Sequence, residues 1–153
     1  MNEQTAQQLA AMDVFTLLGI TDASEEDREA FLNQLQDAIW EEVVEQELAD
    51  SLTDDEIDTI DRVITDEALQ ADEKRNQLFS LLANKVPNLE EGLADATNQL
   101  KYDLLGERVD GLREFYAAKP DQLQVLDQVE EMVNAGNVNE AVATLNKQQA
   151  ENA

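Results

Sequence analysis

The sequence predicts an all-α protein, an irregular bundle of about seven helices joined by short capped turns. Apolar residues recur at the three- and four-residue spacing of a helix along most of the 153 residues, and strand-like alternation is missing. Residues that begin or end helices, such as Ser24, Thr53 and Gly136, border these periodic segments. The apolar share of 42% is enough to build a core.

The first helix is expected to span residues 3–18, and the second is expected to begin after Ser24. Gly19 follows the first, in the place of a left-handed ending. In the second, two adjacent apolar stripes give a wide apolar face, so we expect this helix to be central to the core. The stripes are formed by Leu32, Leu35, Ile39 and Val43, and by Trp40, Val44 and Leu48.

The third and fourth helices carry clear signals for their borders. Thr53 and Glu56 have the spacing of a capping box, and Ile60 and Ile64 continue the apolar face behind them. The fourth helix is expected to begin at Thr65 or Asp66 and to run to about Lys85. Pro87 would end it, because the residue before a proline resists the helical conformation.

The fifth helix is the longest, beginning after Asn88 and extending toward Tyr116. Gly106 and Gly111 interrupt it, each at a cost of about 1 kcal/mol in a helix interior. Either the helix breaks near Gly106, or another backbone approaches closely there. The sixth and seventh helices follow Pro120 and Asn137, separated by Gly136, and form a helical hairpin.

We expect the chain to have three parts: an acidic helical domain over 1–105, a C-terminal helical extension over 106–149 and a frayed tail over 150–153. The charge is also unevenly spread along the chain. The whole chain has 35 acidic and 10 basic residues, a formal net charge of −25, and the segment between Asp22 and Glu73 holds twenty of the acids and two of the bases.

Several short motifs carry a resemblance to a known family. These are Phe15-Thr-Leu-Leu-Gly19-Ile20, Ser24-Glu-Glu with Phe31-Leu32, Ile39 with Val43, Leu52-Thr-Asp-Asp-Glu56, and Lys85-Val-Pro-Asn-Leu-Glu90. Their order and spacing resemble a family of short acidic helical domains of unknown function from candidate-phyla bacteria, over residues 10–105. The resemblance implies a helical fold and a bacterial cytoplasmic setting, and it implies no activity.

The composition argues against an enzyme, and we predict no catalytic, cofactor or metal site. Cysteine and histidine are missing, which removes the thiolate nucleophile, the commonest general base and the commonest transition-metal ligand. A calcium loop starting at Asp54 would need glycine and glutamate where Thr59 and Thr65 stand. We also expect a cytoplasmic protein, with no membrane contact and no direct contact with nucleic acid, because apolar runs are short and the acids dominate.

The sequence favours a protein-interaction module that presents an acidic helical face to an unidentified protein with a basic patch. The candidate partner-binding residues are Trp40, Glu41, Glu42, Glu45, Asp54, Asp55, Asp58 and Asp61. Two alternatives stay open. The chain could mimic a nucleic acid and occupy a DNA- or RNA-binding protein, or its acids could serve only solubility or adaptation to salt. The oligomeric state is not predicted.

Overall fold

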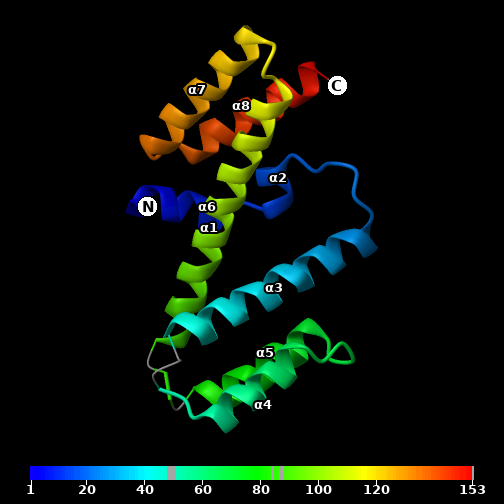
Figure 1. Cartoon of the computed structure of the whole chain (residues 1–153), viewed down its shortest axis with the longest axis vertical. Coiled ribbons are helices and arrows are strands. Elements are labelled where there is room, and N and C mark those ends of the chain that lie inside the picture. Colours follow the sequence, from blue (N-terminus) through cyan, green and yellow to red (C-terminus); the bar gives the residue numbers. More distant parts are fainter. Residues whose placement is uncertain (48–50, 84, 87, 153) are drawn as a thin grey trace. The chain divides into compact units, whose positions relative to one another are not determined.

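The computed structural model describes residues 1–47, 51–83, 85–86 and 88–152 (Figure 1). These residues form eight α-helices and no strand, so the all-α class is confirmed, with eight helices in place of about seven. The helices are α1 (Glu3–Ala11), α2 (Val14–Leu18), α3 (Glu25–Glu47), α4 (Asp54–Ile64), α5 (Ala71–Leu82), α6 (Leu89–Phe115), α7 (Pro120–Asn134) and α8 (Val138–Glu151). Their arrangement as one irregular bundle stays a prediction.

The extra helix arises because the expected helix over 3–18 is two helices. Met12 has an extended backbone and ends α1, and Asp13 then begins α2 by accepting a hydrogen bond from the Thr16 amide through its carboxylate. Gly19 ends α2 in the left-handed region, at φ 69°, and the Ile20 amide donates to the Phe15 carbonyl at 2.9 Å. This is the predicted Schellman ending.

The chain divides into two compact units whose limits differ from the predicted ranges 1–105 and 106–149. Unit 1 comprises Met1–Asp22 and Asn98–Ala153, and unit 2 comprises Ala23–Thr97. The difference has a simple cause in α6. This helix is continuous, so its first residues belong to the core of unit 2 and its later residues belong to the core of unit 1.

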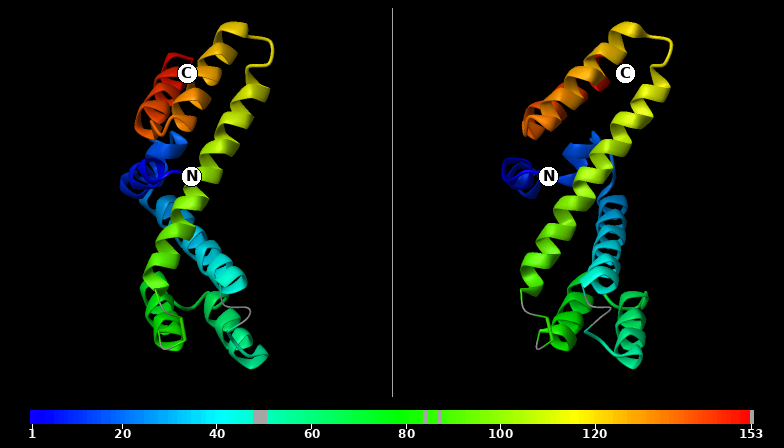
Figure 2. Two further views of the ribbon diagram at one scale, coloured as in Figure 1. Left: turned by 90° about the vertical axis from the view of Figure 1, so that its left-hand side faces the viewer. Right: turned by 60° about the vertical axis from the view of Figure 1, so that its left-hand side comes forward.

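Unit 1 is built on the hairpin of α7 and α8, which pack together as the sequence predicted (Figures 1 and 2). Gly136, at φ 84°, turns the chain between them. Helices α1 and α2 pack on α8. The buried core is shared among these helices and α6, and consists of Leu9, Leu17, Leu105, Val109, Tyr116, Leu126, Val129, Val138, Ala141, Val142 and Leu145. Helix α8 reaches Glu151, beyond the limit of 149 expected for the ordered part.

Unit 2 has a core of its own between α3, α4, α5 and the start of α6. Its buried members are Trp40, Val43, Val44, Leu52, Ile60, Ile64, Leu78, Leu82 and Leu89. The wide apolar face expected on α3 is buried only in part, since Leu32 is 47% exposed. Leu48 lies outside the described residues, as does Pro87.

The start of α5 corrects the prediction that Thr65 or Asp66 caps this helix. Helix α5 begins at Ala71, after Gln70, which makes no side-chain capping bond. Asp66 instead accepts a hydrogen bond from the Ala68 amide at 3.0 Å, which closes a local turn. The other two caps are as predicted. Ser24 Oγ accepts from the Asp27 amide at 3.1 Å, and Thr53 and Glu56 form the full capping box of α4.

Neither explanation offered for the glycines of α6 is correct. The helix does not break, and a Cβ built on Gly106 or Gly111 would meet nothing within 4 Å, so no backbone approaches closely. Buried Leu105 and Val109 anchor this part of the helix in the core of unit 1. Burial of these side chains offsets the low helix propensity of the two glycines.

Candidate functional site

The predicted aromatic anchor, Trp40, lies in the core of unit 2. Its side chain is 2% exposed, and its ring contacts the Phe79 ring edge to face with centroids 5.6 Å apart. A partner has no access to this side chain, so the structure corrects its assignment as a binding residue. The acids beside it in sequence point elsewhere because successive helical residues are separated by about 100°. Glu41 and Glu45 are exposed, and Glu42 is half-buried.

Helix α4 has one buried face and one exposed face. Ile60 and Ile64 are buried in the core of unit 2. The opposite side carries the four predicted aspartates, all of them exposed: Asp54, Asp55, Asp58 and Asp61. Three of these, Asp54, Asp58 and Asp61, follow the i, i+4, i+7 spacing of one helical face. We call the four residues the α4 acidic face.

The carboxylates of the α4 acidic face make no hydrogen bond or ion pair with any other described residue. The neighbouring Glu56 behaves differently, because it closes the capping box and pairs with Lys85. Most cations of unit 2 are likewise engaged. Lys74 is buried against Asp37, and the Arg75 guanidinium lies 5.2 Å from the centre of the Phe79 ring. The negative charge of the α4 acidic face is therefore not compensated by an ion pair with a described residue.

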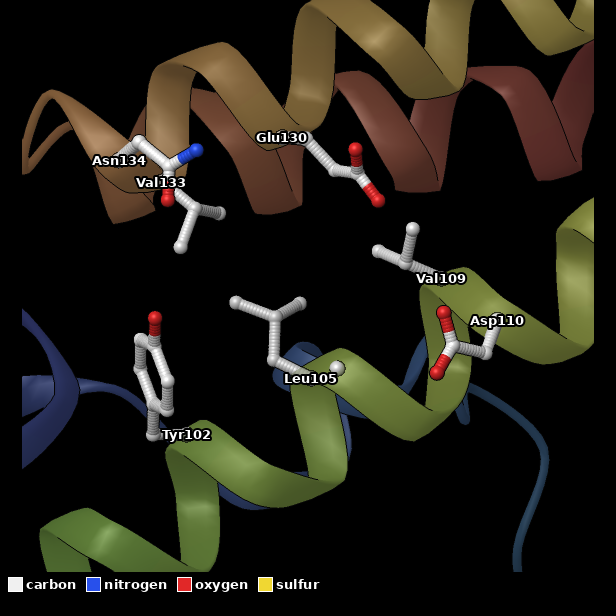
Figure 3. Close-up of a pocket in the computed structure, with 8 residues that line it drawn as sticks. Tyr102, Leu105, Val109, Asp110, Glu130, Val133 and Asn134 are labelled. Atoms are coloured by element: carbon white, nitrogen blue, oxygen red, sulfur yellow. The ribbon is translucent and has the colours of Figure 1, made fainter.

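A second feature, which the sequence did not predict, is a groove in unit 1 between α6 and α7. Its volume is about 220 Å³. Its lining combines apolar side chains with polar groups: Tyr102, Leu105, Gly106, Val109, Asp110, Glu130, Val133 and Asn134. We call this the α6–α7 groove. Figure 3 shows Glu130 on α7 and Asp110 on α6 at one end of the groove, with Val109 between them in this view, while Tyr102 and Asn134 lie toward the other end.

The two acids of the α6–α7 groove have different surroundings. Glu130 shares the Arg113 guanidinium with Asp127, each through a contact of 2.9 Å. Hydrogen bonds from Arg113 to Glu130 and then to Asp127 raise the pKa of Arg113 above its ordinary value. Asp110 is exposed and pairs with no described residue. One guanidinium thus faces two carboxylates, and the third, on Asp110, is uncompensated.

The sequence contained no clear signal for this groove. Gly106 lines it, but Gly111 is also a glycine inside α6 with open space beside it, and Gly111 does not line the groove. The facing residues on α7 could not be predicted, because they lie more than twenty positions away along the chain.

Comparisons with known proteins found no matching family model, no similar curated protein and no similar solved structure. Among the residues that the structure describes, no helix has the length and apolar character needed to cross a membrane. No group of three or more acidic residues in the described ranges has the geometry to hold a metal ion.

Proposed function

We propose that this protein is a non-enzymatic protein-interaction module, and that the α4 acidic face binds a basic patch on a partner protein. The observation that supports this most is the state of the four aspartates. They are exposed on the outer side of a helix whose inner side is buried, and they are unpaired among the described residues. Complementary charge speeds the encounter with a basic partner and selects against acidic ones.

The position of Asp61 favours a role beyond helix stability. Acids in the first turn of a helix, such as Asp54, are favoured by the helix dipole, but an acid in the last turn is disfavoured. Like charges four residues apart, as in Asp54 and Asp58, also cost about 0.2–0.5 kcal/mol per pair. Arg62, in the last turn of the same helix, offsets part of these costs. The negative charge that is left on the α4 acidic face is available to attract a partner.

The test is chemical crosslinking in the native lysate with three versions of the full chain. The first is unchanged, and the second has Asp54, Asp55 and Asp58 replaced by lysine. The third is a matched control in which three exposed acids of unit 1, Glu107, Glu114 and Glu131, are replaced by lysine, so that the total charge changes equally. Circular dichroism checks that all three are folded. We expect the partners to be lost only in the second version.

Retention of every partner by the Asp54, Asp55 and Asp58 variant would contradict the proposal. Two further measurements address the alternatives. A nucleic-acid mimic would compete with DNA or RNA for the captured protein, and its binding would weaken as salt rises. A face that serves only salt adaptation would have no partner, and helix content and melting temperature would rise in molar salt. Binding without competition from nucleic acid is the outcome that we expect.

A further inference from the structure

The junction between α1 and α2 consists of two residues in an extended conformation. Met12 has φ −88° and ψ 131°, and Asp13 has φ −66° and ψ 134°. No glycine or proline precedes Gly19, and the spacing of Met12, Phe15 and Leu18 fits one continuous helix. The segment 3–18 is therefore compatible with two states, which are the two short helices of this structure and one long helix.

The long helix would pair backbone groups that helix ends leave free. The first amides of a helix and its last carbonyls have no partner inside that helix. In one continuous helix, the amides at the start of α2 would bond to the carbonyls at the end of α1. In the present form, the Asp13 carboxylate accepts from the Thr16 amide at 3.1 Å. The Lys101 ammonium lies 2.8 Å from the Leu9 carbonyl. Each state thus has its own set of hydrogen bonds.

Helix α2 is anchored independently of α1. Three of its five residues are buried. Its carbonyls also accept from other helices, as Arg108 Nη1 lies 2.7 Å from the Leu17 carbonyl and Asn146 Nδ2 lies 3.1 Å from the Thr16 carbonyl. An extended residue advances the chain by about 3.3 Å and a helical residue by about 1.5 Å. If α2 keeps its place, conversion of the junction to helix must therefore move α1 off its present position on α8.

Helix α1 lies on α8 through a small set of contacts that α1 of a second copy can make equally well. Thr5 and Leu9 are its buried side chains. Gln8 joins it to the turn before α8, because Nε2 donates to the Gly136 carbonyl and Oε1 accepts from the Asn139 amide, both at 2.9 Å. The nine residues of α1 include a single charged side chain, so local charge opposes the approach of a second copy only weakly.

We propose that two copies of this chain form a dimer by exchanging α1. Residues 3–18 become one helix in each copy, and the α1 part of each lies on α8 of the other. The exchanged helix repeats the contacts of Thr5, Gln8 and Leu9 that it now makes within one chain, so the interface requires no new surface. The contacts of Lys101 with the α1 carbonyls are given up. This inference concerns unit 1 and is independent of the α4 acidic face, which belongs to unit 2.

Two substitutions of Asp13 separate the two states, and both remove the carboxylate that caps α2. Asp13→Ala leaves the junction free to become helical. Asp13→Pro fits the present backbone, where φ is −66°, and prevents a continuous helix. Analytical ultracentrifugation of the full chain measures dimerisation from micromolar to millimolar concentration in about 0.15 M NaCl, where a Debye length of about 8 Å screens the repulsion between copies. We expect Asp13→Ala to dimerise at least tenfold more tightly than the unchanged chain, and Asp13→Pro to stay monomeric.

Crosslinking between copies tests the exchange itself. The chain has no cysteine, so each variant carries one thiol. Gln4→Cys marks α1, and Ala135→Cys marks the turn beside Gly136, where a Cβ would lie 3.3 Å from Gln4 Oε1. The two variants, one of them labelled with ¹⁵N, are mixed and treated with a short bismaleimide, and mass spectrometry measures the mixed pairs. In the control, Gln77→Cys, at an exposed position of unit 2, replaces Ala135→Cys. We expect several-fold more mixed pairs with Ala135→Cys.

The proposal is overturned if Asp13→Ala stays monomeric over the whole range, or if Asp13→Pro dimerises as Asp13→Ala does. Equal yields of mixed pairs from Ala135→Cys and Gln77→Cys would also contradict it, because a dimer would then use another surface. Circular dichroism checks that each variant is folded. If Asp13→Pro does not fold, the crosslinking result decides the proposal.

Discussion

The Lys101 ammonium of α6 lies 2.8 Å from the carbonyl oxygen of Leu9 and caps the C-terminal end of α1. The same Nζ donates to the carbonyl of Met12, also at 2.8 Å. Helix α1 has no basic residue in its own last turn, so a distant helix supplies the positive charge at its end. The Leu9 carbonyl also accepts a hydrogen bond from the Met12 amide at 3.2 Å. Arg108 does the same for α2, with Nη1 at 2.7 Å from the Leu17 carbonyl.

Replacement of Lys101 by methionine should lower the free energy of unfolding by about 1–3 kcal/mol, because two hydrogen bonds from a charged donor are lost and the carbonyls of Leu9 and Met12 stay partly buried. Urea unfolding followed by circular dichroism measures this change. Lys147→Met is the control. The Lys147 side chain is 76% exposed, and its ion pair with Glu151 is long, at 3.9 Å, so its loss should change the stability by less than about 0.5 kcal/mol.

The contribution of Lys101 should also depend on pH. Burial lowers the pKa of Lys101 in the folded protein, against a weaker opposing effect of Asp13. Between this lowered pKa and the ordinary value of 10.5, the unfolded chain binds more protons at Lys101 than the folded chain. The stability difference between the unchanged chain and Lys101→Met should therefore grow as the pH rises through this alkaline window. A difference that shrinks there would contradict the shift.

Lys74 performs the same kind of capping in unit 2. Its Nζ donates to the Ile64 carbonyl, at the end of α4, at 2.8 Å and lies 3.2 Å from both carboxylate oxygens of Asp37. Since the side chain is almost fully buried, Lys74→Met should destabilise the protein by about 2–3 kcal/mol. In a double-mutant cycle, Asp37→Asn should cost less in the Lys74→Met background than in the unchanged chain. Strictly additive costs would show that the two side chains are not coupled.

The burial of Trp40 gives a direct optical test. Trp40 is the single tryptophan of the chain, so the fluorescence belongs to this side chain alone. In the folded protein we expect blue-shifted emission and weak quenching by acrylamide. On unfolding, the emission should shift to the red and the quenching should become strong, because the ring is then solvated. Trp40→Ala should destabilise the protein by about 3–5 kcal/mol, because it removes the ring that packs against Phe79 and leaves a cavity. Strong quenching in the native state would place the ring at the surface.

Two glycine substitutions should act in opposite directions. Gly111→Ala should stabilise the protein by up to about 1 kcal/mol, because α6 is continuous and the added Cβ meets open space. Gly19→Ala should destabilise it, since Gly19 has φ 69° and a Cβ there would approach the Gln149 Oε1 and Arg108 Nη2 atoms within 2.5 Å. Thermal melting of both variants decides this, and the prediction fails if both shift the melting temperature in the same direction.

Local chemistry explains which borders were predictable. The caps at Ser24 and Thr53 and the left-handed ending at Gly19 depend on residues within five positions, so the printed order of residues contains the necessary information. The prediction of a single helix over residues 3–18 failed at Asp13. This residue carries the same capping signal, but the apolar spacing of Met12, Phe15 and Leu18 continues across it and favoured a single helix. Periodicity does not distinguish one helix from two with a tight junction.

The candidate sites divide in the same way. The exposure of Asp54, Asp55, Asp58 and Asp61 follows from the isoleucine spacing of α4, and the structure agrees with it. The burial of Trp40 and the α6–α7 groove do not follow from spacing, because both depend on which helix packs against which. Trp40 meets Phe79 of α5, and the groove needs residues of α6 and α7 together.

The sequence by itself determined the helical content, most helix borders and the acidic outer side of α4, because these depend on dihedral preferences and hydrogen bonds between near neighbours. Only the tertiary structure decided the division into two units and the choice of Lys74, Lys101 and Arg108 as caps for the ends of other helices. Such contacts join residues from ten to more than ninety positions apart, and they form only where burial of apolar side chains has already brought those helices together.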